Sequence, residues 1–200
     1  MGKTKLFVFG ASGHGKVVAD IAELCGYDFC GYIDDNAEEA LHYDDFLKKD
    51  SGAHVALGIG NNVSRAAVYR RLKDHGTKIA TLIHPSAIIA KTARVGEGSV
   101  VMANAVINPD ALVERGAIIN TAAVIEHDNV IDQFVHISPG ALLAGNVAVS
   151  EFSHVGIGTC VIQGIRIGTN CTIGAGSTVL DDIPDRSTAV GTPAKVIKHG

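Results

Sequence analysis

The sequence has few of the residues on which several classes of protein depend. Its four cysteines form no CxxC pair and show no metal-ligand spacing, so neither a zinc ribbon nor a dithiol redox site is expected. We expect Cys160 and Cys171 to be buried thiols beside the core. Tryptophan is absent and aromatic residues make up only 5% of the chain. The core must therefore consist mainly of Val, Ile, Leu and Ala.

Excess charge and long apolar runs are also missing. The net charge is −4 and the pI is near 6.1, which disfavours a general nucleic-acid partner or a polybasic membrane surface. The apolar run Leu6–Phe9 is too short for a secretory signal. The longest uncharged stretch, residues 133–150, contains Gly, Pro, Asn, His and Ser, so no membrane span is expected. These features favour a cytoplasmic protein.

A six-residue repeat occupies the second half of the chain. Every sixth residue from Ile83 to Val179 is aliphatic, and the residue two positions earlier is usually small, as at Ala105 and Ser153. This period fits a coil of three short strands and three tight turns. Within a strand, both the aliphatic residue and the small one point inward. The repeat predicts a parallel β-helix over residues 81–183, followed by an irregular cap at 184–200.

Apolar residues also occupy many outward positions of this β-helix. Val100, Ile118, Val130 and Leu142 each precede an inward aliphatic residue and should point away from the core. A monomer rarely exposes so many aliphatic side chains, and we expect a partner subunit to cover them.

The first 80 residues follow a different pattern. Strands are expected at residues 5–9, 29–33, 54–59 and 78–82, and helices at 16–25 and 64–75. This alternation predicts a small, Rossmann-like parallel α/β domain over residues 1–80.

Three polar loops follow strands of this domain. They are the glycine loop Gly10–Gly15, the pair Asp34–Asp35 and the turn Gly60–Asn62. Open α/β sheets bind ligands at the carboxyl ends of their strands, where an acidic group reaches a ribose hydroxyl. The loops therefore predict a nucleotide-sized pocket. A tight turn, a solvated aspartate pair and a helix-capping role for His14 would explain the same residues.

His127 lies at a corner of the predicted β-helix, between Glu126 and Asp128. A carboxylate partner raises the basicity of an imidazole, as a general base requires. The corner is opposite the face that carries His136, roughly 15 Å away in one subunit. Only a neighbouring subunit of a cyclic trimer would unite the two rings. The gaps between histidines do not suit a metal, so no metal is expected; an exposed corner residue is the alternative for His127.

The motifs together resemble a known family over nearly the whole chain. The segments that carry the resemblance are Gly10–Gly15, Ile33–Asp35, Gly58–Asn62, Val124–Asp128 and Val190–Lys195. They are similar to the sialic-acid O-acetyltransferase-type sugar acyltransferases, and most similar to the UDP-4-amino-sugar N-acetyltransferases of the bacillosamine pathway.

The resemblance implies a left-handed β-helix, a homotrimer and acetyl-CoA in the groove between neighbouring β-helices. It also implies that the N-terminal domain holds the UDP-amino-sugar. By the same resemblance, His127 is the general base and Asp128 its tuning partner. Asp128 stands where the family often has Glu, and Ala175 where Gly is typical. The implied sugar contacts are Ser12, Gly13, His14, Asp34, Asp35 and Gly60, and the implied acetyl-CoA contacts are His136, Ile157 and Ala175, with Asn120 on the same face.

The expected reaction is direct attack of the sugar 4-amine on the acetyl thioester, with no acyl-enzyme. Two alternatives remain open. One is an O-acetyltransferase that acts on a sialic acid or a related sugar hydroxyl. The other is a non-catalytic β-helix that serves as a scaffold or an ice-binding surface.

Overall fold

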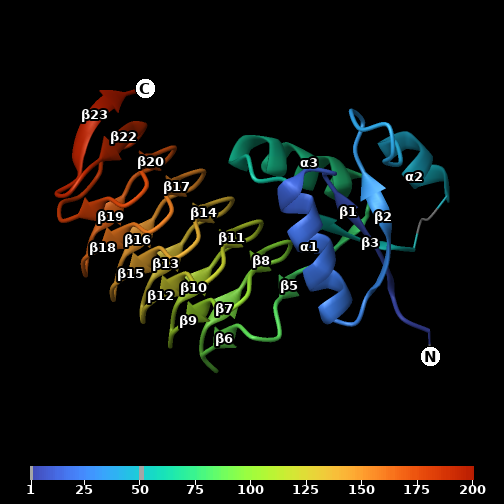
Figure 1. Ribbon diagram of the computed structural model, residues 1–200, viewed down its shortest axis with the longest axis horizontal. Helices are drawn as coiled ribbons and strands as arrows, with labels where there is room; N and C mark the ends of the chain where they lie inside the picture. Colours follow the sequence, from blue (N-terminus) through green and yellow to red (C-terminus); the bar gives the residue numbers. More distant parts are fainter. Residues whose placement is uncertain (1, 50–51) are drawn as a thin grey trace.

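The computed structural model describes residues 2–49 and 52–200, and Figure 1 shows an α/β domain beside one end of a β-helix. The four strands of the domain form a parallel sheet in the order β2-β1-β3-β4. Its elements are β1 (Lys5–Phe9), α1 (Gly13–Leu24), β2 (Asp28–Ile33), α2 (Tyr43–Lys49), β3 (His54–Leu57), α3 (Asn62–Asp74) and β4 (Lys78–Ile79).

Alternation along β1 explains how both faces of this sheet are covered. Leu6 and Val8 pack in a cluster with α1, whereas Phe7 and Phe9 pack in a cluster with α2 and α3. This is the two-residue period of a strand that is buried on both sides. The carboxyl ends of the strands, with their polar loops, are thereby left at one edge.

The β-helix has three faces, each a ladder of two-residue parallel strands. The first face contains β5 (Leu82–Ile83), β8 (Val100–Val101), β11 (Ile118–Ile119), β14 (His136–Ile137), β17 (His154–Val155) and β20 (Thr172–Ile173). The second contains β6 (Ile88–Ile89), β9 (Val106–Ile107), β12 (Val124–Ile125), β15 (Leu142–Leu143), β18 (Cys160–Val161) and β21 (Thr178–Val179). The third contains β7 (Arg94–Val95), β10 (Leu112–Val113), β13 (Val130–Ile131), β16 (Ala148–Val149) and β19 (Arg166–Ile167).

The repeat determines the core of this prism. The second residue of each strand points inward, and Ile107, Ile125 and Ile137 are fully buried. Ala105 and Ala123, two positions before such residues, are equally buried and fill the space that the aliphatic side chains leave. The predicted succession of a small α/β domain and a parallel β-helix is confirmed.

Several local expectations differ from the structure. Helix α1 begins at Gly13 rather than Lys16, and α2 was not expected. The end of the chain is not irregular: β22 (Ser187–Val190) pairs with β20 and, antiparallel, with β23 (Lys195–His199), which extends the first face. Cys160 is exposed because it occupies the outward position of β18, whereas Cys171 is buried as expected.

The chain itself covers some of the outward apolar residues. Val100 and Ile118 are buried in the cluster that contains Val18 and Ile21 of α1, so the expectation that a partner subunit covers them is wrong. On the second and third faces, by contrast, Ile88, Leu142 and Val130 are 65%, 46% and 43% exposed. Within residues 2–49 and 52–200, no helix combines the length and hydropathy that crossing a bilayer requires.

Candidate functional site

The glycine loop after β1 is packed against the loop after β3. The Gly10 N–H donates to Ile33 O, and a Cβ on Gly15 would lie 1.9 Å from Gly10 O. A Cβ on Gly58 would lie 2.5 Å from Cγ1 of Val8. Close packing therefore requires glycine at positions 10, 15 and 58. The tight-turn interpretation accounts for Gly10 and Gly15 of the glycine loop.

Two other glycines of these loops have no such packing reason. Within the described part of the chain, a Cβ on Gly13 or Gly60 would meet no atom within 4 Å, and neither residue has a positive φ. Both loops lie at the carboxyl edge of the sheet, and Ser12, which precedes α1, makes no side-chain cap. The open space above Gly13 and Gly60 suits close approach of a ligand to the backbone.

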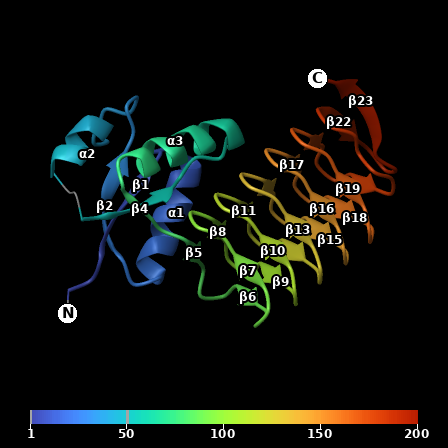
Figure 2. The same ribbon diagram turned by 180° about the vertical axis from the view of Figure 1, so that it is seen from behind.

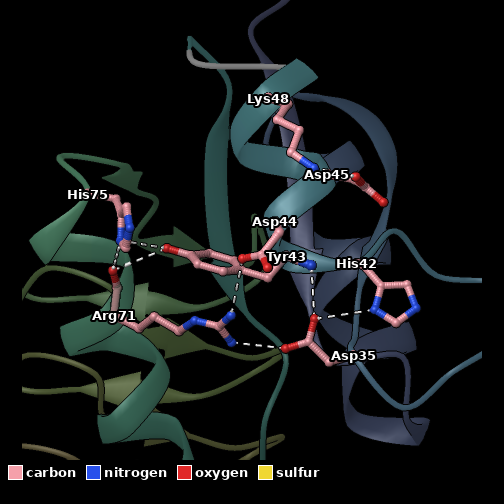
Figure 3. Close-up of polar contacts among 8 residues, drawn as sticks. All are labelled: Asp35, His42, Tyr43, Asp44, Asp45, Lys48, Arg71 and His75. Atoms are coloured by element: carbon pink, nitrogen blue, oxygen red, sulfur yellow. Dashed lines mark hydrogen bonds and ion pairs between the residues drawn. The ribbon is translucent and has the colours of Figure 1, made fainter.

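The two aspartates after β2 have different surroundings. The Ala11 N–H in the glycine loop donates to Asp34 Oδ2 at 3.0 Å, so this carboxylate lies at the candidate pocket. Asp35 accepts from Tyr43 N–H and from Arg71 Nη1, each at 2.9 Å (Figure 3). These two bonds, led by the one from Tyr43, hold the pKa of Asp35 below its ordinary value. Asp35 thus ties α2 to α3, and Arg71 also lies over the ring of Tyr43.

His14, on the first turn of α1, faces the β-helix. Its ring centroid lies 6.3 Å from that of His136 on β14. Burial, with a smaller effect of Arg65, lowers the pKa of His14 to about 4. Its Nε2 atom is buried and has no hydrogen-bond partner among residues 2–49 and 52–200. His14 therefore does not act as a helix cap through Nε2. It is a neutral imidazole directed between the two domains.

His136 is the centre of a cluster on the first face. Asn120 Nδ2 lies 3.1 Å from His136 Nε2, and the rings of His136 and His154 stack with centroids 4.6 Å apart. Ser138 Oγ lies 2.7 Å from His154 Nε2. Burial, followed by the charges of neighbouring groups, lowers the pKa of His136 to about 3. These histidines stay neutral at pH 7 and can serve as hydrogen-bonding groups.

His127 belongs to a separate site at the corner between β12 and β13. Its Nδ1 lies 2.7 Å from Asp128 Oδ2, and Asp128 has a φ of 60°, in the left-handed region. This hydrogen bond raises the pKa of His127 above 6.5. Both side chains are exposed, and the Nε2 atom is the one left to accept a proton.

A single chain does not unite the predicted catalytic groups. His136 lies on the first face, whereas His127 lies where the second face meets the third. Ile157 and Ala175 lie, exposed, on successive coils where the first face meets the second, with the Gly176 N–H bonded to Ile157 O. Asn120 directly follows β11, so it lies where the chain leaves the first face for this corner, next to His136. The predicted sugar-binding loops thus meet the histidine cluster, and His127 stays apart from both.

Two residues that carry the geometry were not found from the sequence. Arg65 is buried between α3 and the β-helix. Its position among other polar residues of α3 predicted an exposed side chain. Gly145 lies under the ring of His127, and its distance of 18 residues, one full coil, was the available signal. No group of three or more His, Cys, Asp or Glu side chains within 2–49 and 52–200 is arranged to hold a metal ion.

Comparisons with known proteins match both halves of the chain. The PglD N-terminal domain family matches residues 5–72. The UDP-N-acetylbacillosamine N-acetyltransferase of Bacillus subtilis is 50% identical over 47 residues, which are 24% of this chain. That aligned segment is only 22% of the relative's own length.

Two solved structures match nearly the entire chain. The acetyltransferase domain of PglB from Neisseria gonorrhoeae is 38% identical, with a TM-score of 0.92 over 98% of this chain and 100% of that one. PerB from Caulobacter crescentus, in complex with CoA and GDP-perosamine, is 35% identical, with a TM-score of 0.92 over 97% of each chain.

Proposed function

The chain belongs to the sugar N-acetyltransferases with a left-handed β-helix, and we propose that it acetylates the 4-amino group of a UDP-4-amino-4,6-dideoxy-N-acetyl-sugar. Acetyl-CoA is the acetyl donor. One observation carries the proposal: the glycine loop and the turn at Gly60 adjoin the histidine cluster, in a chain that matches the PglB acetyltransferase domain from end to end.

The sugar substrate would occupy the edge of the α/β sheet. Gly13 and Gly60 leave their backbone open to it, and Asp34 lies beside the glycine loop. Ser12 and His14 line the same edge and supply neutral hydrogen-bonding groups. Asp35 contributes by holding α2 and α3 in place, since both of its oxygens already accept hydrogen bonds.

Acetyl-CoA would lie along the corner between the first and second faces. Asn120 and His136 mark one end of this corner, and Ile157 and Ala175 provide exposed, uncharged contacts further along. Only a neighbouring subunit would complete the groove. The exposed aliphatic residues Ile88, Leu142 and Val130 of the second and third faces support a homotrimer, because three such prisms packed side by side would cover them.

The chemistry follows from the state of His127. Its Nδ1–H donates to Asp128, which leaves the lone pair on Nε2 for proton abstraction. The sugar amine nitrogen forms a bond to the thioester carbon, His127 takes the proton from that nitrogen, and the C–S bond then breaks. The CoA sulfur leaves and is protonated, so the products are the N-acetylated sugar and free CoA thiol. Holding both substrates in register supplies most of the acceleration.

The test is release of CoA thiol from acetyl-CoA with a panel of acceptors. We expect turnover with a UDP-4-amino sugar, and none with a sialic acid. The GDP-perosamine bound to PerB makes a GDP-4-amino sugar the sharpest competing acceptor. Preference for the GDP sugar would mean that the substrate carries GDP and not UDP. Turnover with sialic acid would favour O-acetylation. No thiol release with any acceptor would refute the proposed function.

A further inference from the structure

Arg65 on α3 is a buried cation without an acidic partner. Its side chain is 1% exposed, and no ion pair involves it in the part of the chain that the structure describes. Burial lowers its pKa to about 9, so the guanidinium remains charged at neutral pH. An unpaired buried charge is costly unless hydrogen bonds satisfy it. The acceptors that satisfy Arg65 therefore indicate its purpose.

Arg65 and Asn62 bind one corner of the β-helix on three successive coils. Arg65 Nε donates to Gly116 O at 2.7 Å, and Arg65 Nη2 donates to Phe134 O at 2.9 Å. Asn62 Nδ2 donates to Phe152 O at 2.9 Å. These three carbonyls belong to residues spaced by 18 positions, so they occupy equivalent places on neighbouring coils. The two side chains thus hold α3 so that its successive turns lie opposite successive coils of the β-helix.

This alignment follows from two similar periods. One turn of an α-helix rises about 5.4 Å, and neighbouring strands of a ladder are about 4.8 Å apart. Side chains one turn apart on α3 therefore meet successive coils, as Tyr69, Arg65 and Asn62 do. Tyr69 Oη donates to Glu97 Oε2 at 2.6 Å on the preceding coil. Figures 1 and 2 both show α3 extending along this edge of the β-helix.

The other nitrogen of the same guanidinium holds the loop after β3. Arg65 Nη1 donates to Ile59 O at 3.1 Å and to Gly60 O at 2.9 Å. Arg65 Nη2 also reaches Val135 O at 3.3 Å, next to His136 in the chain. One planar group therefore joins the loop of the proposed sugar site to the coil of the histidine cluster.

We propose that Arg65, assisted by Asn62, is a positioning residue that fixes the loop at Gly60 relative to the coil of His136. This rests on the proposed function, in which Gly60 and His136 contact different substrates. The geometry sets the distance between the sugar amine and the acetyl thioester. A displacement of about 1 Å is enough to cost on the order of a hundredfold in rate.

The experiment compares Arg65→Lys, Arg65→Met and Asn62→Ala with the control Arg70→Met. Arg70 is exposed on the same helix, and its Nε donates to Ala66 O within that helix. Lysine keeps the positive charge but is a point donor that does not reproduce the planar fork. We expect both Arg65 variants to lose about tenfold or more in kcat, with the KM for acetyl-CoA within about twofold. Asn62→Ala should act in the same direction, and Arg70→Met should match the unaltered chain.

Hydrogen exchange followed by mass spectrometry supplies a readout that does not depend on activity. Exchange should increase in peptides that cover residues 58–62 and 133–137, while residues 104–108 in the β-helix core stay protected. Unchanged kcat and exchange in Arg65→Met would overturn the proposal. So would full activity in Arg65→Lys, or faster exchange along the whole β-helix, which would indicate general stabilisation. A chain without acetyltransferase activity but with the local exchange change would refute only the proposed function.

Discussion

The imidazole of His127 fills the space that the missing side chain of Gly145 leaves. A Cβ on Gly145 would lie 2.5 Å from both Cε1 and Nε2 of the ring. The two residues occupy the same corner of successive coils, with the Asn146 N–H bonded to His127 O. Because Gly145 does not have a positive φ, its backbone conformation alone does not require glycine. Glycine is required at position 145 because any side chain there would occupy the space of the His127 ring.

Gly145→Ala should therefore move the proposed base without unfolding the coil. We expect kcat to fall roughly 10–100-fold, since displacement of a reacting group by about 1 Å has effects of this size. The KM for acetyl-CoA and the melting temperature should change little. Steady-state kinetics and circular dichroism provide the measurements. Gly52→Ala serves as a comparison, because among the described residues no atom lies within 4 Å of the added Cβ and Gly52 has no positive φ. Equal activity of the Gly145 variant and the unaltered chain would contradict this role.

His127→Ala should remove the general base directly. We expect kcat to fall about 10²–10⁴-fold, the usual contribution of general-base catalysis. The KM for acetyl-CoA should stay near its original value, because the ring is placed to take a proton and not to bind CoA. His199→Ala, at an exposed histidine on β23, is the control. Thiol release at saturating substrates decides the outcome, and retention of full kcat would exclude His127 from the mechanism.

Asp128→Asn should move the pH dependence of the reaction. The Asp128 carboxylate raises the pKa of His127 above 6.5, and the base works only when it is unprotonated. The acid limb of kcat/KM should therefore lie above pH 6.5 in the original enzyme. Loss of the carboxylate should shift this limb to lower pH and lower the plateau at the same time. A pH–rate profile with an unmoved acid limb would show that the ion pair does not tune the base.

We expect two inactive variants to complement each other in mixed assemblies, as the proposed homotrimer requires. His127→Ala lacks the base, and Gly13→Val fills the space left open in the glycine loop. A site built from the loops of one subunit and His127 of the next would be intact in some mixed assemblies. Random co-assembly should restore roughly a quarter of the sites. Co-expression with two affinity tags isolates the mixed assemblies, and absence of any recovered activity would place the whole site within one subunit.

The histidine cluster should make folding sensitive to acid. Burial lowers the folded-state pKa values of His14 and His136 to about 4 and about 3. Between pH 6.5 and those values the unfolded chain binds protons that the folded chain does not, so stability falls as the pH falls. One such proton is worth about 1.4 kcal/mol per pH unit, and 1 kcal/mol shifts Tm by roughly 2–4 °C at this size.

The measurement is Tm between pH 7 and pH 5 for the original chain and for His136→Gln. We expect a shallower fall in the variant, whatever its absolute Tm. The charged and titratable groups that face His136 are Arg65, His14 and His154, and they stay the same in both proteins. Identical slopes would mean that His136 takes up its proton as readily in the folded chain as in the unfolded one.

The β-helix was predictable because its determinants repeat along the chain. An inward aliphatic residue every six positions, usually with a small residue two before it, defines the coil, and each coil stacks on the previous one. The positions of His136 and His154 on adjacent coils followed from the same count. The polar loops of the α/β domain were predictable because parallel strands end at one edge. The antiparallel hairpin at residues 187–199 obeys no such repeat and was missed.

By itself, the sequence determined the prism, the loop-bearing edge and the pairing of His127 with an adjacent carboxylate, because each depends on neighbours in the chain or on a constant period. Only the tertiary structure decided that the N-terminal domain covers Val100 and Ile118, that Asp35 binds Arg71, and that Arg65 spans both domains. These contacts join residues separated by irregular distances along the chain. The contacts of Arg65, Val100 and Ile118 arise from the packing of the two domains against each other. The contact between Asp35 and Arg71 arises from packing within the N-terminal domain, and no local pattern encodes either kind.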